Sequence, residues 1–139
     1  MDIDAAMKRI PPHSAEAEQA VLGAMLMNKE AVMVASEIIS GEDFYQTAYG
    51  ILFDAMVELF HKGKPIDLIT LQEHLKEKDV PPEVSSMEYA RDLLVGTQTS
   101  ANVKYYAEIV RDKATLRRLI KINEETANVC YLENKPLEE

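Results

Sequence analysis

The chain has 139 residues, a formal net charge of −9 and one cysteine. Its length suits a single domain, and one thiol cannot form an internal disulfide, so we expect a protein of the reducing cytoplasm. The acidic N-terminus is unlike a signal peptide, and no apolar run approaches the roughly 20 residues that span a bilayer. We therefore expect no membrane partner.

Charge is distributed unevenly along the chain. The net charge is −9 over residues 1–100, +4 over residues 101–121 and −4 over residues 122–139. The six basic residues of the middle segment, which we call the basic arm, are Lys104, Arg111, Lys113, Arg117, Arg118 and Lys121. An acidic chain is atypical of a nucleic-acid-binding domain, so any contact with phosphates would have to come from the basic arm.

Two helices are predicted in the first 40 residues. The first follows Pro11-Pro12, has Ser14 as its N-cap and two glutamates in its first turn, and should end near Asn28. The second should run from Glu30 to about Ile39 and stop before a Ser-Gly pair.

The strongest amphipathic pattern follows a short acidic-aromatic link at residues 42–45. Its apolar residues recur at the three- and four-residue spacing of a helix with one buried face. These residues are Tyr49, Leu52, Phe53, Met56, Leu59 and Phe60. Gly63 should end this third helix, and Pro65 prevents it from resuming.

Two shorter helices are predicted next. Either Asp67 or Thr70 can cap a fourth helix, which should run out at Asp79 before a proline pair. Ser85 and Glu88 can form a capping box for a fifth helix that ends near residue 96.

The last predicted helix starts at Ala101, with Ser100 as its N-cap, and continues to about Ala127. At roughly 1.5 Å per residue it would be about 40 Å long, so it should extend beyond a globule of about 100 residues. Its first turns carry three apolar residues that can dock on the other helices: Val103, Tyr106 and Val110.

Apolar residues also recur every seven positions along this last helix, which is the spacing of a seam between two helices. The predicted seam consists of Ile109, Leu116, Leu119, Ile120, Asn123 and Ala127, and Cys130 continues the seven-residue repeat. A returning helix, another subunit or both could cover the seam.

The predicted fold is all-α, because no segment alternates convincingly as a strand would. We expect a compact globule of about five helices and a long protruding helix. Residues 1–13 would form an N-terminal extension, residues 14–100 the globule and residues 101–139 the first arm and turn of a helical hairpin.

Sequence motifs for catalysis, cofactor binding and metal binding are lacking. None of the five glycines belongs to a phosphate-binding pattern such as GxxxxGK[ST] or GxGxxG. His13, His61 and His74 have no Cys or carboxylate at ligand spacing, so we expect them to be solvated. No residue suggests a base for Cys130 as a nucleophile. We therefore predict no catalytic, cofactor-binding or metal-binding residue.

Three interpretations of the basic arm remain open. A solvated or ion-paired face is favoured, because Glu108 and Asp112 lie on the same predicted helix. A protein-docking surface comes second. Direct contact with nucleic acid comes last, since no set of aromatic residues interleaves with the charges as single-strand binding requires.

Taken together, these motifs give the chain a resemblance to the N-terminal domain of the bacterial replicative DNA helicase family, DnaB. The motifs in order are Pro11-Pro12-x-Ser14, EAEQAVLG at residues 16–23, Asp43-Phe44-Tyr45, Gly63-Lys64-Pro65-Ile66-Asp67, Ala101-Asn102-Val103-x-Tyr105-Tyr106 and Arg117-Arg118-Leu119-Ile120. Two departures from the family pattern are Tyr49, where His is frequent, and Ser85-Ser86, where two glycines usually form the turn.

The resemblance implies a non-catalytic collar domain that is joined to a separate RecA-like ATPase. In that family the ATPase carries the P-loop and uses ATP and Mg, and six subunits form a ring around single-stranded DNA. The N-terminal domains pair through helical hairpins, bind primase and affect the helicase loader. The predicted seam would then be the dimer contact, and Pro136-Leu137-Glu138-Glu139 would lie in the hairpin turn or begin the returning arm.

Two other functions stay open. One is the helicase-interacting domain of primase, which is related in architecture; the N-terminal EAEQAVLG stretch and the long last helix favour the helicase. The other is a helix-turn-helix DNA-binding regulator. Against it, the fifth predicted helix offers Arg91 as its only basic residue, so base readout would have almost no donors.

Overall fold

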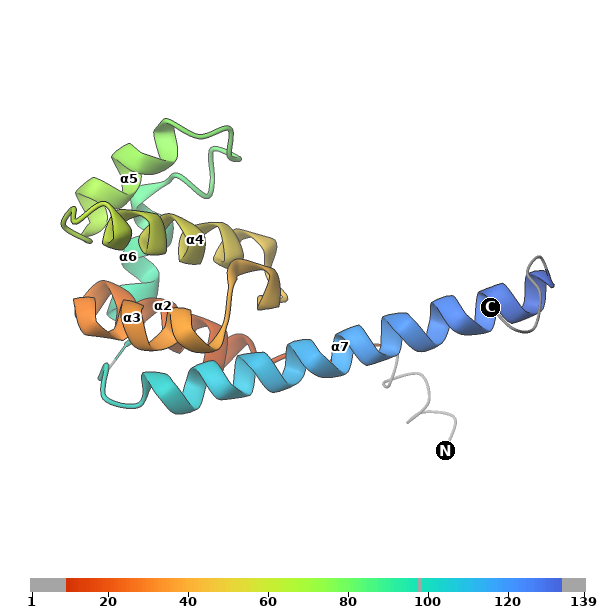
Figure 1. The fold of residues 1–139 in the computed structure, drawn as a ribbon. Helices are drawn as coiled ribbons and strands as arrows, with labels where there is room; N and C mark the ends of the chain where they lie inside the picture. The colour runs from red at the N-terminus through yellow and green to blue at the C-terminus, as the bar shows by residue number, and fades with distance from the viewer. Residues whose placement is uncertain (1–9, 98, 134–139) are drawn as a thin grey trace.

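A computed structural model describes residues 10–97 and 99–133, and every regular element within them is helical. Five α-helices and a short 3-10 helix, η1, form a globule, and the long helix α7 lies along it and continues beyond it (Figure 1). The elements are α2 (Ala15–Met27), α3 (Lys29–Ile38), η1 (Gly41–Asp43), α4 (Thr47–His61), α5 (Leu68–Lys76), α6 (Met87–Val95) and α7 (Val103–Leu132). The predicted all-α fold with a long protruding helix is confirmed.

Helices α2 and α3 begin at capping residues. Ser14 Oγ accepts a hydrogen bond from Ala17 N at 3.1 Å, as the sequence predicts for the first helix. Asn28 ends α2 and also caps α3, because its side-chain oxygen accepts from Glu30 N at 2.9 Å. One residue therefore serves both helix ends and keeps the turn between α2 and α3 short.

The apolar face of α4 lies at the centre of the globule. Leu52, Phe53, Met56 and Leu59 are at most 2% exposed, and they pack in one core with residues of α2 and α3. The amphipathic pattern of the third predicted helix is thus confirmed. Its end is also where the sequence predicts, since Gly63 has φ of 68°, a left-handed conformation that a side chain would strain.

Both candidate caps of α5 act together. Asp67 Oδ1 accepts from Thr70 N at 2.8 Å, and Thr70 Oγ1 accepts from Asp67 N at 3.0 Å, which is a reciprocal capping box.

The capping box predicted for the fifth helix is wrong. Helix α6 has Ser86 as its N-cap, without a side-chain cap bond, and Ser85 Oγ instead donates to Pro82 O at 3.0 Å. Ser85 belongs to a turn over residues 81–86, in which Val84 N donates to Pro81 O at 3.0 Å. The Ser85 hydroxyl, which the sequence pattern predicts as a cap of the helix, therefore forms its hydrogen bond within this turn.

The predicted start of the last helix is also wrong. Helix α7 begins at Val103, with Asn102 in the N-cap position and no side-chain cap bond. Thr99, and not Ser100, supplies the local side-chain bond, because its Oγ1 accepts from Ala101 N at 3.1 Å. The helix ends at Leu132, five residues later than predicted.

His74 is buried, which contradicts the prediction that it is solvated. It is 6% exposed, and its Nε2 lies 3.1 Å from Glu58 Oε2 on α4. Lys78 forms an ion pair with the same carboxylate. The contact depends on α5 packing against α4, so the sequence spacing around His74 could not reveal it.

The pKa of Glu58 generates a pH-dependent prediction. The hydrogen bond from Lys78 holds this pKa below its usual 4.5; burial opposes that effect and the bond to His74 reinforces it. A carboxyl with a depressed folded-state pKa stabilises the fold above its unfolded pKa, and this stabilisation is lost as the pH falls through the folded value. Glu58→Gln should therefore be less stable than the parent at neutral pH, and the difference should shrink in acid.

Urea unfolding midpoints measured from neutral pH to below pH 4.5 would test this prediction. Glu77→Gln, an exposed carboxylate at the end of α5, is the matched control and should show almost no difference at any pH. A difference for Glu58→Gln that stays constant across the range would contradict the assigned ion pairs.

The close approach of α4 to η1 generates a second prediction. A Cβ added at Gly50 would lie 2.4 Å from Gly41 O, a backbone atom that cannot move aside cheaply. Gly50→Ala should lower the free energy of unfolding by about 1–3 kcal/mol in denaturant titrations. At Gly96 the nearest atom to an added Cβ is 3.6 Å away, so Gly96→Ala should change stability by less than about 0.5 kcal/mol. Equal effects would refute the steric argument.

Candidate functional site

Helix α7 packs on the globule through one side of its first half. Val103, Ala107, Val110 and Ala114 are at most 5% exposed, at the spacing of one helical face, and α7 contacts α2 and α3. Docking by Val103 and Val110 is as predicted, and Tyr106 is half-buried against the same core.

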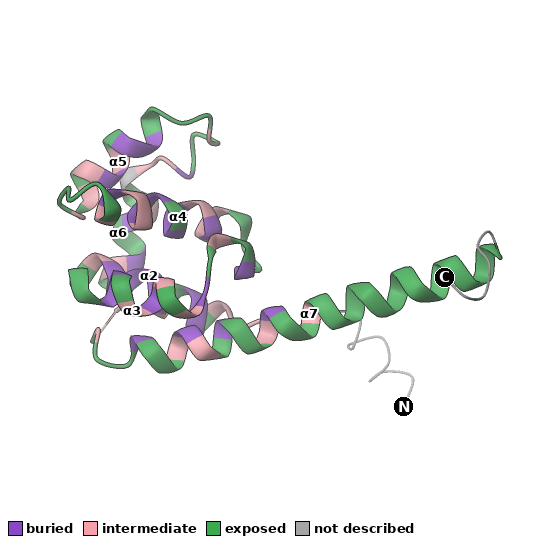
Figure 2. Cartoon of the chain, in the orientation of Figure 1, coloured by how far each residue is buried: buried purple, intermediate pink, exposed green. Residues whose placement is uncertain are grey.

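The second half of α7 has no covering element among the described residues. From Leu116 to Glu133 every residue except the half-buried Arg117 is exposed (Figure 2). The helix has 30 residues, so it is about 45 Å long. The globule covers only its first turns, and the rest protrudes (Figure 1).

The predicted seam residues all lie on α7, and all of them are exposed. Exposure is 40% for Ile109, 45% for Leu116, 51% for Leu119 and 41% for Ile120, and Asn123 and Ala127 are exposed as well. At about 3.6 residues per turn, this stripe lies on the side of α7 roughly opposite the docked residues. The apolar stripe therefore faces away from the globule along its whole length.

Tyr105 extends the stripe, although the seven-residue pattern did not include it. It is 65% exposed and lies four residues before Ile109, on the same face of the helix. The four-residue spacing to Ile109 is the sequence signal that places Tyr105 on this face.

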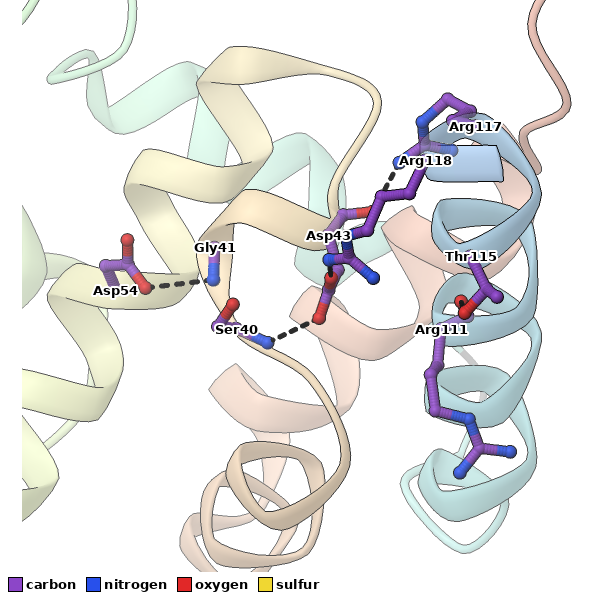
Figure 3. A network of polar contacts seen from close by, with 8 residues as sticks. All are labelled: Ser40, Gly41, Asp43, Asp54, Arg111, Thr115, Arg117 and Arg118. Atoms are coloured by element: carbon purple, nitrogen blue, oxygen red, sulfur yellow. Dashed lines mark hydrogen bonds and ion pairs between the residues drawn. The ribbon is translucent and has the colours of Figure 1, made fainter. Parts of the chain in front are cut away.

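Two residues of the basic arm bind the globule. Arg117 donates to Pro12 O at 2.8 Å. It also donates to Asp43 O at 2.6 Å, and Arg118 forms an ion pair with the Asp43 carboxylate (Figure 3). Asp43 is 6% exposed and also accepts from Ser40 N at 2.9 Å. We call these contacts of Pro12, Asp43, Arg117 and Arg118 the latch.

The latch contacts aromatic side chains on one side and is linked through η1 to helix α4 on the other. The Arg117 guanidinium lies 5.7 Å from the ring centroid of Tyr45, and His13 stacks on that ring with centroids 4.0 Å apart. On the other side of η1, Asp54 of α4 accepts from Gly41 N at 3.1 Å (Figure 3). Helix η1 thus joins α4 to α7 at the point where α7 leaves the globule.

The other four residues of the basic arm form no common surface. Arg111 pairs with Asp112 at 3.3 Å and with Glu108 at 4.0 Å, both on α7. Lys104, Lys113 and Lys121 make no ion pair within the described residues, and their positions point to different sides of the helix. The structure therefore divides the basic arm into a latch and a scattered remainder.

Breaking the latch should destabilise the fold. Asp43→Ala removes the partner of Arg118 and of Ser40 N, so the free energy of unfolding should fall by about 1–3 kcal/mol. Amide hydrogen exchange should also become faster in the docked part of α7. Glu42→Ala is the control: this exposed neighbour forms no side-chain hydrogen bond within the described residues, and its variant should stay within about 0.5 kcal/mol of the parent. Equal losses in the two variants would show that the latch contributes nothing.

A cavity of about 560 Å³ lies in the globule where α2, α4, α6 and α7 meet. Its lining residues are Glu16, Gln19, Ala20, Tyr49, Tyr89, Asp92, Leu93, Gly96, Thr97, Thr99 and Tyr106. Tyr49 Oη accepts from Gln19 Nε2 at 2.9 Å, and the rings of Tyr49 and Tyr89 are 5.9 Å apart. Burial raises the pKa of Tyr89 to about 12, so its phenol is neutral at physiological pH.

Residues 10–97 and 99–133 contain no group of three or more His, Cys, Asp or Glu side chains arranged to hold a metal ion. The helices in those ranges are also too short or too polar to span a bilayer. The surfaces that stand out are the exposed stripe of α7 and the cavity of the globule.

Comparison with known proteins identifies the family. The family model described as "DnaB-like helicase N terminal domain" matches residues 10–112, which is most of the chain. The chain belongs to this family. It is 45% identical over 114 residues to the replicative DNA helicase DnaB of Geobacillus stearothermophilus, and 38% identical over 131 residues to the replicative DNA helicase DnaC of Bacillus subtilis. These matches cover 82% and 94% of the chain but only 25% and 29% of the relatives.

Solved structures have the same fold. The crystal structure of the N-terminal domain of DnaB helicase from Mycobacterium tuberculosis superposes with a TM-score of 0.83 at 35% identity, and covers 87% of this chain and 88% of that one. The N-terminal domain of DnaB helicase from Helicobacter pylori superposes with a TM-score of 0.71 at 18% identity, and covers 83% and 89%. That Helicobacter pylori domain is described together with its interactions with primase.

Proposed function

We propose that this chain is the N-terminal collar module of a replicative DNA helicase, which assembles subunits and docks partners without catalysing a reaction. The exposed apolar stripe on α7 carries the proposal, because it faces away from the chain's own globule. The chain spans about a quarter of the length of the curated relatives it matches. ATP hydrolysis, with its ATP and Mg, would belong to the remainder of the whole helicase.

Self-association through the seam is the main partner interaction of this proposal. The free energy falls when a second helix removes exposed Leu and Ile side chains at seven-residue spacing from water. A second subunit would pair along α7, and pairs of subunits would build the hexameric ring. The hairpin turn or start of the returning arm predicted for residues 136–139, and residues 1–9 of the N-terminal extension predicted for residues 1–13, lie outside the described residues.

Primase is the second partner in this proposal. Support comes from the related domain of Helicobacter pylori, which is described with its interactions with primase. A helicase loader would act on the same collar, and single-stranded DNA would pass through the ring of the whole protein. The basic arm is a poor candidate for DNA contact, because Arg117 and Arg118 are already bound within the latch. The site of action would be the bacterial cytoplasm.

Two alternatives are less well supported. A helicase-interacting domain of primase would not be expected to match curated helicases at 38–45% identity along nearly its whole length. A helix-turn-helix regulator would need base-reading donors on an exposed helix, and α6 carries Arg91 as its one basic residue.

Charged substitutions in the seam should prevent self-association. Leu116→Asp with Ile120→Asp places two carboxylates at the centre of the stripe, where pairing would desolvate them. We expect the association constant in analytical ultracentrifugation to fall at least about tenfold. Far-UV circular dichroism should be almost unchanged, since both residues are exposed in the single chain.

The control introduces two carboxylates elsewhere on the same part of α7, and because it also removes a lysine, a general charge effect would be larger in it than in the seam variant. Lys121→Asp with Asn128→Asp lies roughly opposite the stripe by helical periodicity, and should leave the association constant within about a factor of two. Loss of association in both double variants would indicate a general charge effect. An unchanged association constant in the seam variant would remove the proposed contact.

A further inference from the structure

The cavity between α2, α4, α6 and α7 has aromatic walls. Tyr49 comes from α4, Tyr89 from α6 and Tyr106 from α7, and all three side chains are half-buried. Three helices thus bring aromatic residues to one hollow, although the residues are far apart in the sequence. The quadrupole of an aromatic ring makes its face partially negative, and this face attracts cations.

Two carboxylates line the same cavity. Glu16 on α2 and Asp92 on α6 are both exposed, and neither forms a side-chain hydrogen bond or an ion pair within the described residues. In contrast, the carboxylates of Glu18, Asp43 and Glu58 all have partners inside the fold. Glu16 and Asp92 therefore remain available to a ligand.

No basic side chain is present among the described lining residues to balance this charge. The other polar groups are Gln19, Thr97, Thr99 and the tyrosine hydroxyls. An anionic ligand would be repelled, and a purely apolar ligand would desolvate carboxylates without pairing them. A cation that contacts the rings and the carboxylates satisfies both features of the lining.

We propose that this cavity is a socket for an arginine or lysine side chain of a protein partner. The cavity of about 560 Å³ is large enough for the side chain together with adjacent backbone. The acidic charge of residues 1–100 would attract a basic partner surface over a longer range. The proposal goes beyond the collar function, because it concerns the globule and not the seam, and it names the chemistry of the bound group.

The test is a ¹H–¹⁵N NMR titration of the complete chain with blocked pentapeptides. Each peptide has two alanines on either side of a central arginine, lysine or citrulline, and citrulline is an uncharged near-isostere of arginine. We expect the arginine or lysine peptide to shift the amide signals of Gly96, Thr97 and Thr99. Citrulline should shift them far less, and added salt should weaken the binding.

Isosteric variants test whether the carboxylates of the cavity bind the cationic peptide. Asp92→Asn and Glu16→Gln should each weaken binding of the cationic peptide by about two- to fivefold. Glu88→Gln lies on the same helix as Asp92, and Glu30→Gln occupies the first turn of α3 as Glu16 does in α2. Neither control residue lines the cavity, so both variants should bind as the parent does.

Three results would contradict the proposed socket. The first is the absence of shifts at these amides at millimolar concentrations of the cationic peptides. The second is an equal response to citrulline, which would make the cavity an apolar site. The third is an equal loss of affinity in the control variants, which would reduce the effect to overall acidity. The ultracentrifugation of the seam variants is independent of these outcomes, so the two proposals can fail separately.

Discussion

The packing of α7 against α2 and α3 is the contact on which the remaining features depend. Four small or β-branched residues, Val103, Ala107, Val110 and Ala114, let the helix lie close to the globule. Because a helix buries one side at a time, docking by this side turns the apolar stripe from Ile109 to Ala127 outward. The same contact brings Tyr106 to the cavity. The exposed stripe that we propose for assembly and the wall of the cavity are therefore consequences of one helix orientation.

The contact between α7 and the globule ends at the latch. Beyond Ala114 the helix has no further small apolar residues facing the globule, and Arg117 and Arg118 instead reach back to η1. Guanidinium groups suit this position, because they can bond to a backbone carbonyl and a carboxylate while their stems remain partly exposed. Asp43 is in turn held by Ser40 N, and Gly41 by Asp54, so the exit direction of α7 is tied to the core helix α4.

Acidic side chains play two different parts in this domain. Those inside the fold have partners: Glu18 accepts from Tyr45 N and Gln46 N, Asp43 pairs with Arg118, and Glu58 pairs with Lys78. Glu16 and Asp92 beside the cavity are exposed and form no side-chain hydrogen bond or ion pair within the described residues, and three tyrosines line the same cavity. The formal charge of −9 is therefore not uniform in its role, since part of it is paired within the globule and part is exposed beside the cavity, where we propose that a basic partner binds.

Sequence alone determined the helices, the buried face of α4 and the surplus length of α7, because periodicity and the Gly63 turn are local properties. Spacing within one helix also predicted the seam residues; the structure shows them exposed on α7, and their role in self-association stays a prediction. Tertiary structure decided which polar groups are partners: His74 meets Glu58 across two helices, and Arg117 donates to Pro12 O across 105 positions. It likewise assembled the cavity from α2, α4, α6 and α7. Contacts between distant segments depend on how helices pack, and no local spacing encodes that.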